Sequence, residues 1–188
     1  MTRIAGIKTA TLATAATLVA ALALPAHAVT KVVEFNVLNA TAMLPTPFAS
    51  GDTLLLDTTV TQETGPLSQS ITFTLGAGVT ALTGRAAWEI STATGPGPRL
   101  VGVNIDIFDA GNNLVLSDAF AGVLAGFAVS TFDGPIGPGT YRLVATGNAV
   151  RDTVLDVSIT AVPEPGIYSL LLAGLGVVCV RARRRHLG

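Results

Sequence analysis

The sequence predicts an all-β protein: a single β-sandwich of about eight antiparallel strands, Ig-like or jelly-roll-like, between a signal peptide and a C-terminal transmembrane helix. Three observations predict the sandwich. Apolar and β-branched residues alternate with polar ones over short stretches, which is the period-2 pattern of half-buried strands. Clusters of Gly, Pro, Asn and Asp separate these stretches. They also interrupt every candidate helix of the central segment before it completes three turns.

The strand signals recur along the central segment, and turn residues lie between them. We expect strands at residues 31–38, 53–61, 69–75, 85–91, 100–108, 114–118, 139–146 and 153–161. Residues 122–132 are a further candidate strand. In the last two expected strands, Tyr141 and Leu143 share one face, and so do Val157 and Ile159. These faces are the predicted core sides.

The clearest hairpin joins residues 103–108 to residues 114–116. The connecting residues 109–113 include Gly111 and Asn112, which are residue types that tolerate a positive φ. We therefore expect these two strands to be antiparallel neighbours.

The chain has 188 residues, of which 49% are hydrophobic and 12% charged, and much of the apolar excess lies at the two ends. We predict a signal peptide at residues 1–28, an exported β-sandwich domain at residues 29–161 and a separate C-terminal signal at residues 162–188. The central segment is long enough for one domain with its own core.

The N-terminal segment has the parts of a secretory signal peptide. A basic start with Arg3 and Lys8 precedes an apolar stretch at residues 9–24, and small residues follow at Ala26 and Ala28. These small side chains fit the shallow pockets of a signal peptidase, so we expect cleavage after Ala28. An uncleaved anchor is the alternative, but the apolar stretch is short for a membrane span.

The C-terminal segment has three parts in a fixed order. A proline-rich motif comes first, an uncharged run fills residues 167–180, and a basic tail follows. The motif is Val162, Pro163, Glu164 and Pro165, and the tail carries Arg181, Arg183, Arg184 and Arg185. Fourteen helical residues reach about 21 Å, against a hydrocarbon core of about 30 Å. The run therefore spans a membrane only marginally, with snorkelling arginines that fix the cytoplasmic end.

This order resembles the PEP-CTERM sorting signal of Gram-negative bacteria, whose motif stands here as Pro163, Glu164 and Pro165. In that family an integral-membrane exosortase is thought to cut near the motif and pass the protein to the cell surface. The resemblance implies a transient anchor in the inner membrane, held by the arginines as a membrane stop. We expect the motif itself to lie outside the fold, held extended by its prolines. An ordinary tail anchor is the alternative.

Parts of the central segment are similar to the FxDxF branch of PEP-CTERM proteins. The late element of that branch is present as Gly139, Thr140, Tyr141, Arg142 and Leu143. The Phe-x-Asp-x-Phe motif itself is absent, since residues 67–73 read Leu-Ser-Gln-Ser-Ile-Thr-Phe. Branch membership therefore stays open, and the sorting signal does not depend on it.

The exported segment is acidic and lacks two reactive residue types. It has five basic and eleven acidic residues, a net charge of −6, which disfavours nucleic acid as a partner. Cys179, His27 and His186 all lie in the terminal segments. Without imidazole or thiolate, the domain has no Ser-His-Asp triad, no cysteine nucleophile and no zinc site of the usual kind. We expect no cofactor and no disulfide.

Oxygen ligands for calcium are conceivable at Asp106, Asp109, Asn112 and Asn113. Their spacing does not fit an EF-hand. A polar hairpin tip, in which Asp and Asn side chains bond to backbone amides, explains the same residues. We favour the hairpin tip and predict no metal.

Carboxylate pairs and an aromatic residue are the candidates for carbohydrate chemistry. Glu63 with Glu89, or Asp106 with Asp118, are conceivable glycosidase pairs, for which a separation of about 5 to 9 Å is needed. Nothing in the sequence brings either pair together. Trp88 is either a sugar-stacking side chain, which must be exposed, or a core residue.

These observations predict a secreted, surface-sorted, non-catalytic protein of the cell envelope or of an exopolysaccharide biofilm matrix. Its expected partners are signal peptidase and exosortase during export, and extracellular polysaccharide afterwards. The alternative is a carbohydrate-binding module or a polysaccharide-acting hydrolase of the same matrix.

Overall fold

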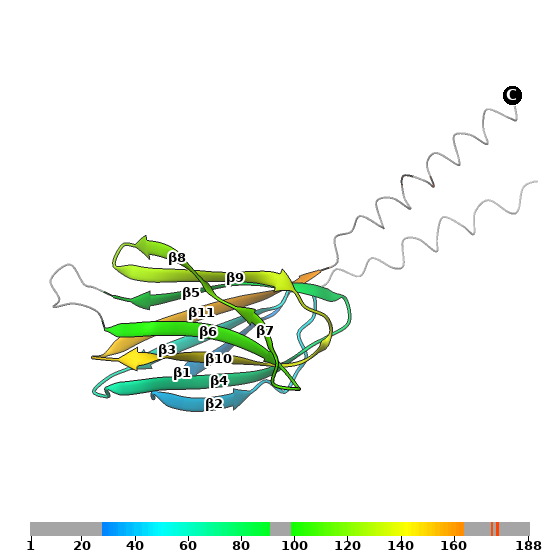
Figure 1. Ribbon diagram of the computed structural model, residues 1–188. Helices are drawn as coiled ribbons and strands as arrows, with labels where there is room; N and C mark the ends of the chain where they lie inside the picture. The colour runs from blue at the N-terminus through cyan, green and yellow to red at the C-terminus, as the bar shows by residue number, and fades with distance from the viewer. Residues whose placement is uncertain (1–27, 91–98, 164–173, 175, 177–188) are drawn as a thin grey trace, which may run out of the picture.

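The computed structural model describes residues 28–90 and 99–163, together with residues 174 and 176 (Figure 1). Residues 28–90 and 99–163 are all-β, as predicted. Its strands are β1 (Thr30–Phe35), β2 (Asn39–Met43), β3 (Thr53–Val60), β4 (Gly65–Leu75), β5 (Val79–Glu89), β6 (Leu100–Asp109), β7 (Leu114–Ser117), β8 (Ala119–Leu124), β9 (Phe127–Pro135), β10 (Gly139–Ala149) and β11 (Thr153–Pro163).

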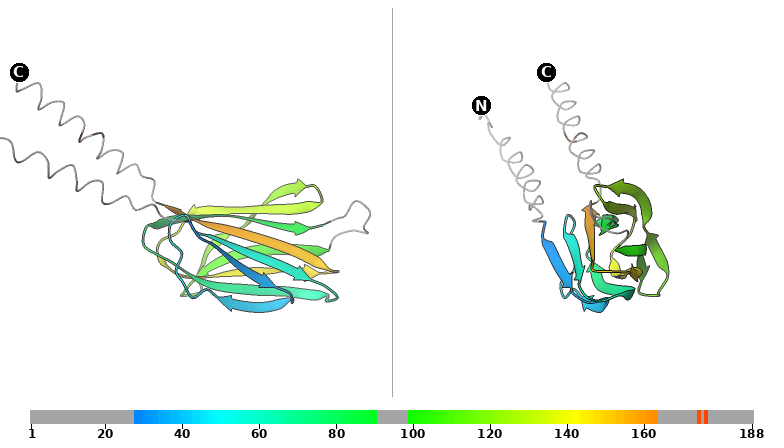
Figure 2. Two further views of the ribbon diagram at one scale, coloured as in Figure 1. Left: turned by 180° about the vertical axis from the view of Figure 1, so that it is seen from behind. Right: turned by 90° about the vertical axis from the view of Figure 1, so that its left-hand side faces the viewer.

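The strands form two sheets that stack face to face (Figure 2). One sheet has six strands in the order β1-β3-β11-β5-β9-β8, and the other has five in the order β2-β4-β10-β6-β7. Most consecutive strands lie in different sheets, so the chain crosses repeatedly between the layers. The predicted hairpin of residues 103–116 is confirmed as β6 and β7, and Asn112 has a φ of 63° in its turn.

The core lies between the two sheets and follows from the alternation in the sequence. In β3, Leu54 and Leu56 are buried, whereas Leu55 and Asp57 between and after them are exposed. The largest fully buried side chains are Phe48, Phe73, Leu54, Leu56, Leu67, Ile71, Leu75, Leu82, Leu100, Ile105, Ile107 and Leu143. Burial of each such side chain contributes about 1.5–3 kcal/mol.

The structure corrects the strand count and the prediction that all strands are antiparallel. Eleven strands are present in the described part, and β1 pairs with β3 and β2 with β4 in parallel. Residues 31–38 do not form one strand, because the chain leaves β1 at Phe35 and crosses to the other sheet as β2. The stretch of residues 122–132 is likewise divided. Ala125 and Gly126, with φ of 50° and 87°, turn it into the β8–β9 hairpin.

Gly84 is required where β5 passes under an aromatic ring of β9. A Cβ at Gly84 would lie 2.2 Å from Cε2 and Cζ of the buried Phe132, its partner in the strand register. Gly84→Ala should therefore destabilise the domain by about 1–3 kcal/mol through overpacking, measured by chemical unfolding. Gly137→Ala is the matched control, because a Cβ at Gly137 meets nothing within 4 Å. Equal stabilities of the two variants would contradict this account of the packing.

Candidate functional site: the end of the last strand

The last strand runs into the predicted sorting motif. β11 pairs antiparallel with β3 and β5, and its register with β5 continues through Val162 opposite Ala81 and Pro163 opposite Val79. The expectation that Pro163 lies outside the fold is therefore wrong. Proline lacks a backbone N–H, but it is tolerated at this place because the register shifts between Val162 and Pro163 and the strand ends there.

The turn that precedes β3 holds this end of β11. The Gly51 N–H donates to the Ala161 carbonyl at 2.7 Å, and the Ala161 N–H donates to the Asp52 carbonyl at 2.9 Å. The hydroxyls of Thr53 and Thr160 add a bond of 3.0 Å. The sorting motif therefore begins at the residue directly after Ala161, whose N–H and carbonyl are both hydrogen-bonded to this turn.

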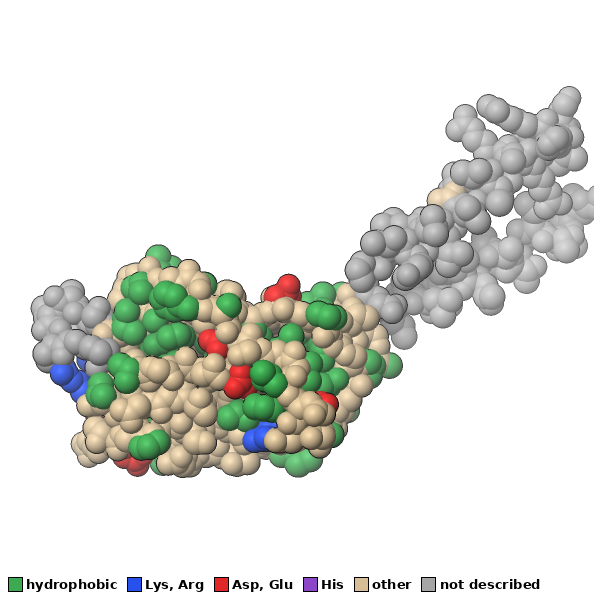
Figure 3. All heavy atoms as spheres, in the orientation of Figure 1, with side chains coloured by type: hydrophobic (Ala, Val, Ile, Leu, Met, Phe, Trp, Pro, Cys, Tyr) green, Lys and Arg blue, Asp and Glu red, His purple; other side chains and the backbone are tan. Residues whose placement is uncertain are grey.

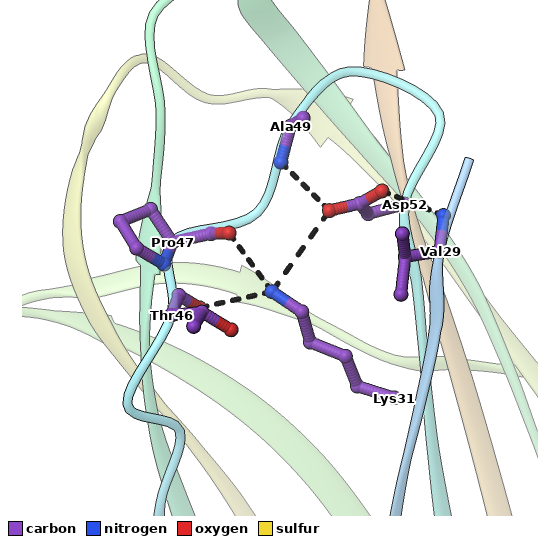
Figure 4. Close-up of polar contacts among 6 residues, drawn as sticks. All are labelled: Val29, Lys31, Thr46, Pro47, Ala49 and Asp52. Carbon is purple, nitrogen blue, oxygen red and sulfur yellow. Dashed lines mark hydrogen bonds and ion pairs between the residues drawn. The ribbon is translucent and has the colours of Figure 1, made fainter. Parts of the chain in front are cut away.

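The same turn contacts the N-terminal strand through the Asp52 side chain (Figure 4). Its Oδ1 accepts a hydrogen bond from the Val29 N–H at 2.8 Å, and its Oδ2 accepts one from the Ala49 N–H at 2.9 Å. Lys31 Nζ lies 3.9 Å from Oδ2. Sequence reasoning missed Asp52, although a lone acid between Gly51 and an apolar strand was the available signal.

Both ends of the domain lie at the same end of the sandwich, because Val29 and Ala161 bond to one turn. Figures 1 and 2 show the first and last strands meeting there.

Of the predicted site residues, Ala28, Val162 and Pro163 are placed by the structure. Ala26, Glu164, Pro165, the apolar run apart from residues 174 and 176, and Arg181, Arg183, Arg184 and Arg185 lie outside the described residues. Among the described residues, no helix has the length and apolarity to cross a membrane.

The calcium candidates on the β6–β7 hairpin bond mainly to their own turn. Both carboxylate oxygens of Asp109 accept hydrogen bonds from Asn113, and the side-chain bond from Asn113 is the main cause of the lowered pKa of Asp109. Asp106 accepts a bond from Asn104, and Asn112 accepts one from Arg142. In the part of the chain that the structure describes, no three His, Cys, Asp or Glu residues form a group that could hold a metal.

The candidates for carbohydrate chemistry also have structural contacts of their own. Glu63 accepts a bond from the Leu38 N–H at 3.3 Å, and Glu89 lies 3.4 Å from the Arg99 guanidinium. Asp118 accepts from the Ile105 N–H at 2.8 Å. Trp88 is 7% exposed and belongs to the core. It therefore does not supply the exposed aromatic surface that a sugar-stacking role for this residue requires.

A row of carboxylates crosses the outer face of the six-stranded sheet. Glu34 on β1 lies opposite Asp57 on β3, and Asp57 lies opposite Asp156 on β11. Partial burial, and then the charge of Asp57, raise the pKa of Asp156 above its ordinary value of 3.8. Neighbouring ionised carboxylates in this row therefore repel one another and lower the stability of the folded sheet.

An apolar patch covers the β8–β9 hairpin, at the end of the sandwich away from Pro163 (Figures 1 and 3). It consists of Phe120, Val123, Leu124 and Phe127, which are 67%, 59%, 65% and 37% exposed. By the strand register, Phe120 and Val123 lie on one face of the hairpin, and Leu124 and Phe127 lie on the other. We call it the β8 patch. A shallow depression beside it is lined by residues that include Arg85 and Thr131, and no acidic side chain is among them.

Comparison with known proteins identifies the C-terminal segment. The protein-family model of the PEP-CTERM protein-sorting motif matches residues 161–185. The match starts at Ala161, where the turn before β3 holds β11, and it covers the predicted motif and the arginine cluster. The chain is therefore an all-β protein with a C-terminal sorting signal, and that signal is of the PEP-CTERM type, as predicted. The signal implies export, membrane-anchored sorting and an exosortase as the processing partner.

The other comparisons add little. No curated protein matches the sequence significantly. A solved structure of the pre-peptidase C-terminal domain of a collagenase from Bacillus anthracis matches 72% of this chain and 98% of its own, with 9% identity and a TM-score of 0.35. A TM-score this low indicates neither a shared fold nor a shared function. The FxDxF branch finds no support in these matches.

The raised pKa of Asp156 predicts a pH-dependent effect of its replacement. Because the folded-state pKa lies above the ordinary value of 3.8, ionised Asp156 lowers stability once the pH rises through that folded-state pKa, and the cost is absent below 3.8. Asp156→Asn should raise Tm by about 1–2 °C at pH 7 and leave it unchanged at pH 3. Asp133→Asn, opposite Thr83 on β5, is the control. A gain that persists at pH 3 would contradict the electrostatic cause.

Proposed function

We propose that this protein is a secreted, non-catalytic component of the cell envelope or of an exopolysaccharide matrix. Signal peptidase removes residues 1–28, the C-terminal helix holds the domain transiently in the inner membrane, and an exosortase processes the chain at Val162, Pro163, Glu164 and Pro165. The cell surface or the extracellular matrix is its final location. The observation that carries this proposal is the sorting-motif match at residues 161–185, which begins inside the last strand of the β-sandwich.

The arrangement of the domain supports a role without catalysis. Glu63 and Asp118 accept hydrogen bonds from backbone amides, Glu89 pairs with Arg99, and Asp106 accepts from the Asn104 side chain. The depression beside the β8 patch has no acidic side chain in its lining. A glycosidase needs two carboxyl groups facing a common cleft. The contacts of these carboxylates hold neighbouring parts of the fold together, and this supports a structural role for them.

Glu164→Ala tests the sorting proposal. Glu164 follows Pro163, the last paired residue, so its replacement should leave folding unchanged. It removes the one charge of the motif, and we expect the variant to accumulate uncut in the inner membrane of an exosortase-positive host. Surface protein should fall at least about tenfold, measured by fractionation and immunoblotting.

Glu34→Ala is the matched control, because Glu34 is an exposed acid on the edge strand β1. It should reach the surface like the wild type. The same experiment in an exosortase-negative host should retain all three proteins. If Glu164→Ala reaches the surface as fast as the wild type, the C-terminal segment is only an anchor.

The β8 patch favours a second candidate function, binding of matrix polysaccharide. Phe120 is the most exposed aromatic side chain of the described residues, and Val123 lies on the same face of the hairpin. Aromatic faces stack on the apolar faces of sugar rings. The patch lies away from the end that carries the sorting signal, so it stays accessible while the chain is anchored.

Phe120→Ser should weaken binding to purified exopolysaccharide of the producing cell by about fivefold to tenfold, which corresponds to about 1 kcal/mol. Binding is measured by affinity electrophoresis through a gel that contains the polysaccharide. Met43→Ser is the control, because Met43 is 75% exposed on β2 in the other sheet. Equal retardation of both variants and the wild type would count against the β8 patch as the binding surface.

A further inference from the structure

The buried carboxylate of Asp52 is bonded to the backbone nitrogen at which the predicted signal-peptide cleavage occurs. Asp52 is 4% exposed, and its Oδ1 lies 2.8 Å from the Val29 nitrogen (Figure 4). Cleavage after Ala28 would turn this nitrogen from a peptide amide into the chain terminus. A buried acid and the predicted new terminus are thus already in hydrogen-bonding contact.

The cation beside Asp52 only partly balances its charge. Lys31 Nζ lies 3.9 Å from Oδ2, at the limit of an ion pair. Its hydrogen bonds go instead to the carbonyls of Thr46 and Pro47, at 2.9 and 2.8 Å, and it lies 4.3 Å from the centre of the Phe48 ring. A buried carboxylate is costly unless it is well paired. The amide that bonds to Oδ1 carries no charge, so a cationic donor in its place would balance the carboxylate better.

We infer that Asp52 is the binding site of the Val29 α-ammonium group that signal-peptide removal creates. Hydrolysis of the Ala28–Val29 bond consumes one water. The water oxygen goes to the Ala28 carbonyl carbon, which leaves as a carboxylate. The Val29 nitrogen takes both hydrogens of the water and becomes an ammonium. In the amide bond to Oδ1 only the acceptor is charged, whereas after cleavage donor and acceptor both carry a charge, so that the contact becomes an ion pair as well as a hydrogen bond. This inference rests on the removal of residues 1–28 in the proposed function and is independent of exosortase.

The geometry leaves space for the ammonium group. The Ala28 side chain lies beside Gly51, 3.6 Å from where a Cβ on Gly51 would stand. Removal of Ala28 frees the space between the Val29 nitrogen and Gly51, and the hydrogen bond from this nitrogen to Asp52 can remain. The Val29 carbonyl is fixed independently, because it accepts a bond from the Thr53 N–H at 2.9 Å. The bond from Thr53 to the Val29 carbonyl therefore keeps the Val29 nitrogen close to the Asp52 carboxylate after cleavage.

The same site reaches the other end of the domain. The Asp52 carbonyl accepts the Ala161 N–H, and Gly51 donates to the Ala161 carbonyl. Binding of the new terminus therefore steadies the turn that holds β11 two residues before Pro163. N-terminal processing reinforces the strand from which the sorting signal leaves the domain.

The test uses the full chain, exported with its own signal peptide. Mass spectrometry first establishes whether the mature chain starts at Val29. A second version carries Gly-Ser inserted between Ala28 and Val29, which moves the new ammonium away and leaves a peptide amide at Val29. Both versions are also made with Asp52→Asn. Thermal unfolding of the exported proteins is followed by protease resistance.

We expect the insertion to lower Tm by about 3–5 °C with Asp52 present and by less than about 1 °C with Asp52→Asn. An equal shift in both backgrounds, or no shift with Asp52 present, overturns the inference. A mature terminus other than Val29 overturns it as well, but leaves exosortase-dependent sorting intact. Loss of exosortase dependence with a normal Tm pattern instead contradicts the sorting proposal alone.

A second measurement decides the question if Asp52→Asn does not fold. Lys31 is the only lysine after residue 28, so Lys31→Arg leaves the α-amine as the sole amine that acetylation can modify. Acetylation should lower the Tm of the mature Lys31→Arg protein by the same 3–5 °C. It should not change the Tm of the Gly-Ser version, whose terminus is already displaced. Equal effects on both proteins overturn the inference.

Discussion

The contact between Asp52 and its neighbours is the constraint on which both ends of the domain depend. Its side chain bonds to Val29, and its backbone carbonyl bonds to Ala161. The first and last strands of a domain are usually the easiest to detach from it. Here one turn holds both, so the first and last strands of the domain are fixed to one another through Gly51 and Asp52 as well as through the sheet.

The sorting signal begins within the folded domain, because the matched segment starts at residue 161 of β11. β11 ends at Pro163 and the apolar run begins at Ile167, so three residues separate the sheet from the run. Three extended residues span at most about 10 Å. A protease that reads this motif must approach beside the folded sandwich. The outer rim of β3, β5 and the turn before β3 is therefore part of what such an enzyme meets.

The fold class was predictable because the period-2 pattern and the turn residues are local properties of the sequence. The core faces of β10 and β11 followed from it. The parallel pairs did not, because the choice of sheet depends on contacts far along the chain. β2 has no alternation strong enough to indicate a strand, and Ala125 is an uncommon residue for a positive φ. The C-terminal signal was readable because its parts are contiguous, whereas Asp52 gains its contacts only through Val29 and Ala161.

The edge position of β1 has a consequence for the proposed removal of residues 1–28. Signal peptidase needs an accessible, extended backbone around residues 28 and 29. In the folded domain the Val29 nitrogen and carbonyl are both hydrogen-bonded, one to Asp52 and the other to Thr53. β1 is an edge strand that pairs only with β3, which β11 holds on its other side. The rest of the six-stranded sheet can therefore form first, and β1 can dock after the cut. In the proposed processing, cleavage therefore precedes the pairing of β1 with β3, and the turn that would receive the new terminus forms beforehand.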